Sequence, residues 1–202
     1  MQKIFIKSGI YSLIKTILIT SLLVGCANSV KKPEIIVNNI KLSAPVLTKT
    51  DQTAYQKALE LMKNKSFDEA HRIFSELIAN YPNLAGAYVN LAFINKAQSD
   101  DTKAEENINK ALKINPSNID ALIQRAAYSQ NKGEFKKVEL YLLAAEAVDS
   151  SNEIVQYNLA ILYELYLQQY EDAIDHYENY IALSSNEDKE TVKRWVMLLE
   201  RK

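Results

Sequence analysis

Cysteine, glycine and proline are scarce in this sequence. Among 202 residues there is one cysteine, Cys26, and there are four glycines and four prolines. A single cysteine excludes an internal disulfide and a metal site built from several cysteines. So few glycines and prolines argue against the many turns of a β-sandwich or β-barrel, whereas the Ala, Leu, Glu, Lys, Asn and Gln content suits helices. We therefore expect an all-α protein with one folded domain.

The sequence also lacks a run of basic residues. Its formal net charge is −1, from 24 basic and 25 acidic residues. Lys3, Lys7 and Lys15 lie in the first 25 residues, which contain no acid, so the rest of the chain has 21 basic residues (24 less 3) against 25 acidic ones, or −4. A mildly acidic chain offers no electrostatic footprint for nucleic acid or an anionic membrane surface. We expect no nucleic-acid partner.

The first 25 residues have the pattern of a secretory signal peptide. The three lysines precede a short apolar run from Ile17 to Val24, which only Thr20 and Ser21 interrupt. A membrane-spanning helix needs about 20 apolar residues, so this run is too short to span a bilayer comfortably. The pattern predicts a signal peptide over residues 1–25.

The end of this segment, Leu23-Val24-Gly25-Cys26, resembles the lipobox of bacterial lipoproteins. The resemblance implies cleavage before Cys26, a diacylglycerol on its sulfur and a further fatty acid, such as palmitate, on the new N-terminus. Three acyl chains hold a protein on a membrane far more firmly than one. Ala27, where an aspartate would favour the inner membrane, implies the outer membrane, facing the periplasm. The alternatives are an uncleaved signal anchor and a buried cysteine in an apolar helix.

Residues 26–50 are expected to be the lipidated cysteine and an extended tether. They include Pro33 and Pro45 and show no helical apolar period. Such a segment would let the folded part stand off the membrane. Residues 35–47 are more apolar than a pure linker, so the alternative is that they dock onto the protein's own surface or fill its groove.

From residue 51 the sequence repeats with a period of 34 residues. Five series of residues recur at this step and in phase with one another: three consist mainly of small residues, one of bulky apolar residues and one of prolines. The series are Ala58, Ala92, Ala126 and Ala160; Ala70, Ala104 and Val138; Phe74, Ile108 and Leu142; Leu77, Ala111 and Ala145; and Pro82 and Pro116. A fixed period of this length indicates a repeat architecture.

These residues resemble the tetratricopeptide repeat (TPR), whose unit is two antiparallel helices with small residues where they cross. The resemblance implies an all-α TPR solenoid of four repeats, at 51–84, 85–118, 119–152 and 153–186, followed by a capping helix at 187–202. The second repeat matches best. The fourth departs from the pattern, with one residue inserted near Leu167 to Tyr170 and Tyr180 in the place of an alanine.

The same resemblance implies a concave groove lined by the first helix of each repeat, which we expect to bind a partner. The groove residues are Tyr55, Leu59, Met62, Val89, Phe93, Lys96, Ile123, Ala127, Gln130, Tyr157, Ile161 and Glu164. A largely apolar trough of helices suits an extended or amphipathic peptide. A carboxylate clamp, found in some proteins of this family, is not expected, because only Asn90 matches it. The alternative is that some of these side chains are interior packing.

No pattern in the sequence predicts catalysis, a cofactor or a metal site. His71 and His176 lack ligands at suitable spacing, and we expect both to be solvated surface residues. Six of the twelve tyrosines fall in the fourth repeat. We expect most of them to pack their rings against the capping helix while their hydroxyls reach water, and the alternative is a second contact surface.

The sequence therefore predicts a non-catalytic, lipid-anchored scaffold or assembly factor of the bacterial cell envelope that binds another envelope protein. It is similar to pilotin lipoproteins of type IV pili and to TPR lipoproteins that recruit peptidoglycan enzymes or serve outer-membrane protein assembly. The alternatives are a self-associating structural module, with homo-oligomers or a self-occupied groove, and capture of a small molecule or glycan.

Overall fold

The computed structural model describes residues 44–201. The predicted signal peptide, Cys26 and the predicted tether as far as residue 43 lie outside the described residues. The described residues form two compact units, 44–150 and 151–201. Helices are the only regular secondary structure in them, and the predicted all-α fold of TPR-type helix pairs with a final helix is confirmed.

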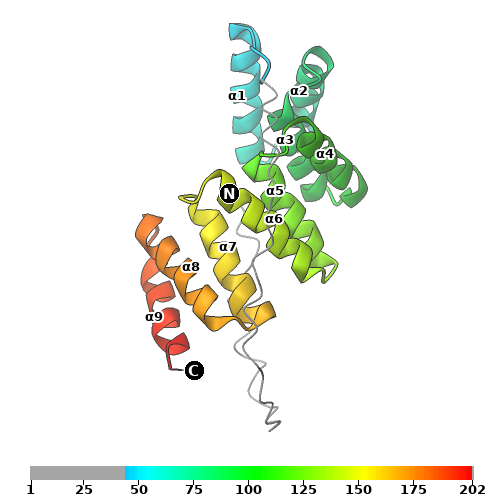
Figure 1. Cartoon of the computed structure of the whole chain (residues 1–202). Coiled ribbons are helices and arrows are strands. Elements are labelled where there is room, and N and C mark those ends of the chain that lie inside the picture. Colours follow the sequence, from blue (N-terminus) through cyan, green and yellow to red (C-terminus); the bar gives the residue numbers. More distant parts are fainter. Residues whose placement is uncertain (1–43, 202) are drawn as a thin grey trace. The chain divides into compact units, whose positions relative to one another are not determined.

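The unit of residues 44–150 consists of three helix pairs (Figure 1). Its helices are α1 (Lys49–Lys63), α2 (Phe67–Asn80), α3 (Ala85–Ala97), α4 (Asp101–Ile114), α5 (Ile119–Asn131) and α6 (Phe135–Val148). α1 packs on α2, α3 on α4 and α5 on α6, while α2 contacts α3 and α4 contacts α5. Because the connections are short, neighbouring helices run antiparallel and the pairs stack in chain order.

The unit of residues 151–201 contains one further pair and a final helix. Its elements are α7 (Glu153–Leu162), a π-helical turn (Tyr163–Leu167), α8 (Tyr170–Leu183) and α9 (Lys189–Leu199). α8 packs on both α7 and α9. Val192, Val196 and Leu199 are the buried residues of α9, so this helix covers one side of the pair with an amphipathic face.

Side-chain caps begin several of these helices. The Asn118 Oδ1 accepts a hydrogen bond from the Ala121 amide at 2.9 Å, and the Asn152 Oδ1 accepts one from the Val155 amide at 3.1 Å. Each bond satisfies an amide that has no partner within its own helix. The starts of α5 and α7 are thereby fixed by single asparagines.

The repeating small and apolar residues occupy the core. In both units they are completely buried or nearly so, and their exposed fractions range from 0% to 2%. They are Ala58, Ala70, Phe74, Leu77, Ala92, Ala104, Ile108, Ala111, Ala126, Val138, Leu142, Ala145, Ala160 and Ala173. Small side chains at these positions let paired helices approach closely, which is why the sequence period predicts the core so well.

The turn inside each helix pair places one residue in the left-handed region. Lys65, Ser99 and Gly133 have φ angles of 61°, 65° and 71° and follow one another at steps of 34 residues (99 less 65, and 133 less 99). The next such residue, Gln168 with φ 55°, comes 35 residues after Gly133 (168 less 133). The fourth pair therefore contains one extra residue.

The extra residue is taken up by the π-helical turn. At the end of α5, the Glu134 amide donates to the Ser129 carbonyl, five residues back, at 2.9 Å, whereas the corresponding Gln169 amide donates to the Tyr163 carbonyl, six residues back, also at 2.9 Å. A π-helical turn is wider than an α-helical turn by one residue. The turn ends at Leu167, where the segment of the predicted insertion (Leu167 to Tyr170) begins. It lets α8 keep its pairing with α7.

Candidate protein-binding surface

The first helices of successive pairs lie side by side in the unit of residues 44–150. Asn90 on α3 donates a hydrogen bond from Nδ2 to the Tyr55 hydroxyl on α1, at 2.9 Å. Gln124 on α5 donates from Nε2 to the Val89 carbonyl oxygen on α3, at 3.3 Å. Both pairs of residues are 35 positions apart, so each bond joins corresponding helices of successive repeats. α1, α3 and α5 therefore form one surface, which carries the predicted groove residues of this unit.

Tyr55 is held firmly on this surface. Its ring packs edge-on against Phe74 at a centroid distance of 5.2 Å, and its hydroxyl lies over Gly86, where an added Cβ would be 2.8 Å away. Burial raises the pKa of the Tyr55 hydroxyl above its ordinary value and the charge of Asp120 adds to the effect, while the Asn90 hydrogen bond opposes it. Tyr55 is thus a neutral, well-positioned aromatic group.

Leu59, Met62 and Phe93 are half-buried apolar residues beside Tyr55 in the predicted groove. Tyr55, Leu59 and Met62 follow one another at spacings of four and three along α1, which places them on one helix face. Leu59 and Met62 pack against the core between α1, α2 and α3. The Phe93 ring lies 6.4 Å from that of Phe67 in an edge-on contact. Contacts with the core and with Phe67 hold these side chains in place, while part of their surface stays exposed.

The other groove residues of this unit differ in exposure. Val89 and Ile123 are buried, with exposed fractions of 6% and 8%, while Ala127 and Gln130 are half-buried and Lys96 is exposed. The predicted groove of this unit therefore contains both buried and accessible side chains. Its accessible part runs from the aromatic and aliphatic groups of α1 and α3 to the polar ends of α3 and α5.

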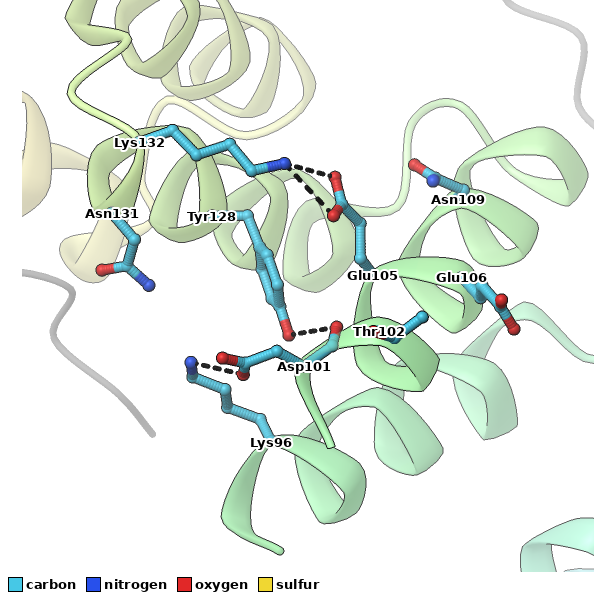
Figure 2. A pocket seen from close by; sticks show the side chains of 9 residues that line it. All are labelled: Lys96, Asp101, Thr102, Glu105, Glu106, Asn109, Tyr128, Asn131 and Lys132. Atoms are coloured by element: carbon cyan, nitrogen blue, oxygen red, sulfur yellow. Dashed lines mark hydrogen bonds and ion pairs between the residues drawn. The ribbon is translucent and has the colours of Figure 1, made fainter. Parts of the chain in front are cut away.

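A polar pocket of about 380 Å³ lies beside Lys96, where α3 ends, α4 begins and α5 ends (Figure 2). Its lining residues are Lys96, Asp101, Thr102, Glu105, Glu106, Asn109, Tyr128, Asn131 and Lys132. Lys96 Nζ lies 2.6 Å from Asp101 Oδ1 and 5.4 Å from the centroid of the Tyr128 ring. The end of the predicted groove is thus charged rather than apolar.

Tyr128 stands in this pocket as a neutral hydrogen-bond donor. Its hydroxyl donates to the Asp101 carbonyl oxygen at 3.3 Å. Burial, followed by the charges of Asp101, Glu105 and Asp100, raises the pKa of Tyr128 to about 12. The neutral ring makes a cation–π contact with Lys96, whose Nζ lies 5.4 Å from its centroid.

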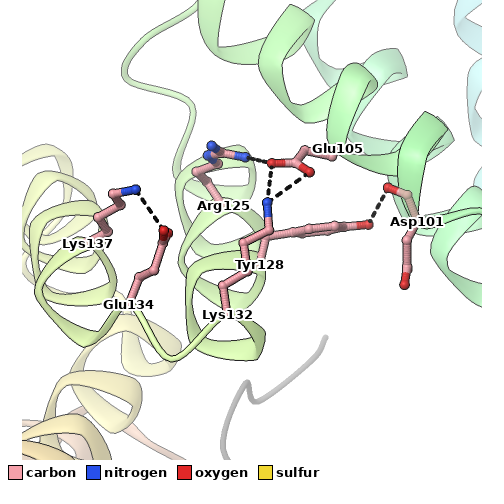
Figure 3. A network of polar contacts seen from close by, with 7 residues as sticks. All are labelled: Asp101, Glu105, Arg125, Tyr128, Lys132, Glu134 and Lys137. Carbon is pink, nitrogen blue, oxygen red and sulfur yellow. Dashed lines mark hydrogen bonds and ion pairs between the residues drawn. The ribbon is translucent and has the colours of Figure 1, made fainter.

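Glu105 is the centre of an ion network between α4 and α5 (Figure 3). Its carboxylate lies 2.6 Å from Arg125 Nη1 and 3.0 Å from Lys132 Nζ. The hydrogen bond from Arg125, then the one from Lys132, holds the pKa of Glu105 below its ordinary value. The network therefore joins the second repeat to the third, next to the pocket.

Sequence reasoning did not find Tyr128, Glu105 or Lys132 as members of one site. Arg125 lies 20 residues and Lys132 lies 27 residues after Glu105, and neither spacing is a motif within one helix. Once the 34-residue register is known, the end of each helix is predictable, and charges clustered at those ends are the signal that could have found the pocket.

The predicted groove residues of the other unit are buried. Tyr157, Ile161 and Glu164 have exposed fractions of 5%, 0% and 5%. The Tyr157 ring contacts Tyr180 at a centroid distance of 5.1 Å, and Glu164 accepts a hydrogen bond from the Tyr177 hydroxyl at 2.6 Å. In this unit the three side chains are part of the interior.

Two expectations about aromatic residues in this unit need correction. Tyr177 does pack against α9, with its ring 6.0 Å from Trp195, but its hydroxyl reaches Glu164 rather than water, and the Tyr180 hydroxyl donates to Asp188 at 2.6 Å. His176 is not a solvated surface residue, because it is buried and stacks on Tyr163 at 5.4 Å. Tyrosines can fill this core because their hydroxyls find polar partners, Glu164 in the interior and Asp188 at the surface.

Within residues 44–201, no group of three or more His, Cys, Asp or Glu side chains could hold a metal ion. In the same residues, no helix is both long and apolar enough to cross a membrane.

The sequence model of the tetratricopeptide repeat family matches residues 155–186. This is the fourth helix pair, although the second has more of the family's typical residues in place. No curated protein sequence matches the chain.

The structure is similar to two solved structures of MamA. MamA 41-end from Desulfovibrio magneticus RS-1 is 19% identical, with a TM-score of 0.56 over 77% of this chain and 98% of that chain. The MamA RS-1 ArsTM double mutant is 18% identical, with a TM-score of 0.55 over 77% of this chain and 97% of that chain. PilW, a widely conserved type IV pilus biogenesis factor, is 16% identical, with a TM-score of 0.46 over 76% of this chain and 87% of that chain. At these identities the two MamA structures show a shared fold and nothing about a shared function. The match to the family model makes residues 155–186 similar to a tetratricopeptide repeat.

Proposed function

We propose that this chain is a non-catalytic scaffold or assembly factor of the bacterial cell envelope, which binds a segment of another envelope protein along α1, α3 and α5. The observation that carries the proposal is the set of half-buried apolar side chains Tyr55, Leu59, Met62 and Phe93 on adjoining first helices. Such groups lose little conformational freedom when a partner covers them, because the core already holds them in place. Aromatic anchors of this kind contribute strongly to protein interfaces.

The bound segment has an apolar part and a polar end. The apolar part lies over Tyr55, Leu59, Met62 and Phe93. Its polar end reaches Lys96 and Gln130, where the surface meets the charged pocket. An amphipathic helix or extended peptide with apolar residues on one side has this chemistry.

The proposal includes a membrane anchor at Cys26. Residues 1–25 act as the signal peptide, Cys26 carries the lipid, and the segment that follows is the tether, with the TPR part facing the periplasm from the outer membrane. Support comes from the order of basic residues, apolar run, Gly25 and sole cysteine. Replacing Cys26 with serine should abolish incorporation of labelled palmitate and cleavage of the signal peptide. A Cys26→Ser chain that still incorporates palmitate contradicts the anchor and leaves the binding surface untested.

The binding surface is tested by a charged substitution at Phe93. In cells that make the protein, Phe93→Asp should reduce the recovery of specifically copurifying envelope proteins by at least about tenfold, as expected for an interface anchor. Leu140→Asp on α6 is the matched control, since Leu140 is an exposed apolar residue (41%) outside the predicted groove. Equal losses from both variants, or from neither, would count against this surface.

A further inference from the structure

α9 carries two exposed apolar residues, Met197 and Leu198, with exposed fractions of 49% and 54%. Charged residues flank Met197 along the helix. Together with α8, the face of α9 that carries Met197 lines a groove of about 560 Å³. The groove residues on the two helices are Glu178, Ile181, Ala182, Glu190, Lys193, Arg194, Val196, Met197 and Glu200. Ile181, Ala182 and Val196 give the groove an apolar floor next to Met197.

This face is the open end of a stack of helices. In its unit, α7 pairs with α8, and α9 packs on α8 through Val192, Val196 and Leu199. The opposite side of α9 packs on no further helix of that unit. Repeat arrays need a polar surface at such an end, so two adjacent exposed apolar residues there, Met197 and Leu198, favour a contact.

Two charges on this face have no ion-pair partner within the described residues. Lys193 is paired with Glu190 at 2.7 Å. Arg194 donates to the Thr191 hydroxyl at 3.0 Å, and its charge helps to lower the pKa of Glu190, but it forms no ion pair with a carboxylate of the described residues. Glu200 likewise makes no ion pair with any residue from 44 to 201. Arg194 and Glu200 lie three residues before and three residues after Met197.

The equal spacing of Arg194 and Glu200 on either side of Met197 is complementary to a second, antiparallel copy of the same helix. When two α9 helices pack antiparallel about a twofold axis at Met197, the residue three places before the axis meets the residue three places after it on the other copy. Arg194 of each copy then lies opposite Glu200 of its partner, and the two methionines meet at the centre. An isologous contact requires this kind of self-complementary surface.

We propose that the chain forms a twofold symmetric dimer through α9, with Met197 at the centre and reciprocal Arg194–Glu200 ion pairs on either side. The interface uses one helix face and the adjoining edge of α8, so it is small, and its dissociation constant lies between micromolar and millimolar. Confinement on a membrane would raise the effective concentration and favour the dimer. The dimer does not depend on the proposed partner surface, which lies in the other unit.

The first test places a cysteine at the centre of the interface. The full chain with Met197→Cys, treated in membranes with a short bis-maleimide, should give a dimer whose crosslinked peptides join position 197 of one copy to position 197 of another. Leu140→Cys, of similar exposure on α6, is the control and should give at least about tenfold less of the corresponding product. The absence of this dimer, or a crosslink from position 197 to another protein or to this chain's own residues 26–43, would overturn the proposal.

The second test reverses the charges in the Met197→Cys background. Arg194→Glu alone sets two carboxylates against each other on both sides of the axis, and Glu200→Arg alone does the same with two cations. Each should lower the yield of crosslinked dimer by about tenfold, because like charges at contact repel. All three positions are exposed, and unchanged thermal unfolding will show that each variant is folded.

Mixing the two reversed chains distinguishes a self-complementary interface from any other occupant. In a mixed dimer, one copy carries Arg194→Glu and has carboxylates at both flanking positions, while the other carries Glu200→Arg and has guanidinium groups at both. Every facing pair is then attractive. Coexpression of the two variants with different tags should restore the crosslink between them to within about threefold of the starting yield. Failure of the mixture to recover, with both single variants defective, would refute the twofold pairing.

Discussion

Asn90 holds Tyr55 in place across the boundary between the first two repeats. Its Nδ2 donates to the Tyr55 hydroxyl and to the Gly86 carbonyl oxygen, each at 2.9 Å. The hydroxyl lies so close to Gly86 that an added Cβ would be 2.8 Å from it. The first helix of the second repeat therefore needs a glycine where Tyr55 crosses it.

Gly86→Ala should lower the free energy of unfolding by about 1 kcal/mol, although alanine usually favours a helix over glycine. The cost comes from displacing the Tyr55 hydroxyl from Asn90. In a Tyr55→Phe background the hydroxyl is absent, and Gly86→Ala should then be neutral or stabilising by about 0.5 kcal/mol. Urea unfolding of the four chains measures this coupling, and an equal effect of Gly86→Ala in both backgrounds would refute the account.

The left-handed turn residues predict opposite effects for two substitutions 34 residues apart. Gly133→Ser should destabilise the protein by about 1 kcal/mol, because φ at this position is 71° and an added Cβ meets nothing within 4 Å that could compensate. Ser99→Gly should stabilise it by a smaller amount, since glycine relieves the backbone at φ 65° but gains freedom in the unfolded chain. Melting temperatures that move in the same direction for both would be inconsistent with this explanation.

Glu105 should make stability depend on pH in acid. Its pKa in the folded state lies below the ordinary value of 4.5 because of Arg125 and Lys132. A carboxyl with a lowered pKa stabilises the fold above its unfolded pKa, and this contribution disappears as the pH falls through the folded value. Glu105→Gln should therefore cost about 1 kcal/mol near neutral pH and much less at about pH 3.

The matched control for this substitution is Glu106→Gln on the same helix. Glu106 is exposed and makes no ion pair within the described residues, so its substitution should leave the free energy of unfolding nearly unchanged at both pH values. Urea titrations of the three chains at the two pH values measure the difference. A Glu105→Gln effect as large in acid as at neutral pH would argue against an ionic origin.

The repeat core could be predicted from sequence because its determinants are local and periodic. Ala92 and Ala126 mark the same helix crossing one repeat apart, and both are completely buried. The inserted residue could be placed as well, since it shifts the small residue of the fourth pair to Ala173. A sequence period does not predict how much of each side chain is buried by neighbouring helices.

The groove illustrates that limit. Phe93 and Ile161 occupy equivalent positions in their repeats, 68 residues apart (161 less 93), yet Phe93 is half-buried and Ile161 is fully buried. Tyr157 and Glu164 are drawn into the interior by Tyr180 and Tyr177, which stand in the repeat that departs from the pattern. These contacts join residues of different helices, so no single-helix pattern predicts them.

Photo-crosslinking from Phe93 in the cells that make the protein tests the proposed function most directly. A photoreactive residue in place of Phe93, on the accessible part of the surface, should attach one distinct envelope protein, identified by mass spectrometry, and the same residue in place of Leu140 should not. Attachment only to a second copy of this chain, or to its own residues 26–43, would contradict the scaffold and favour a self-associating module or a self-occupied groove.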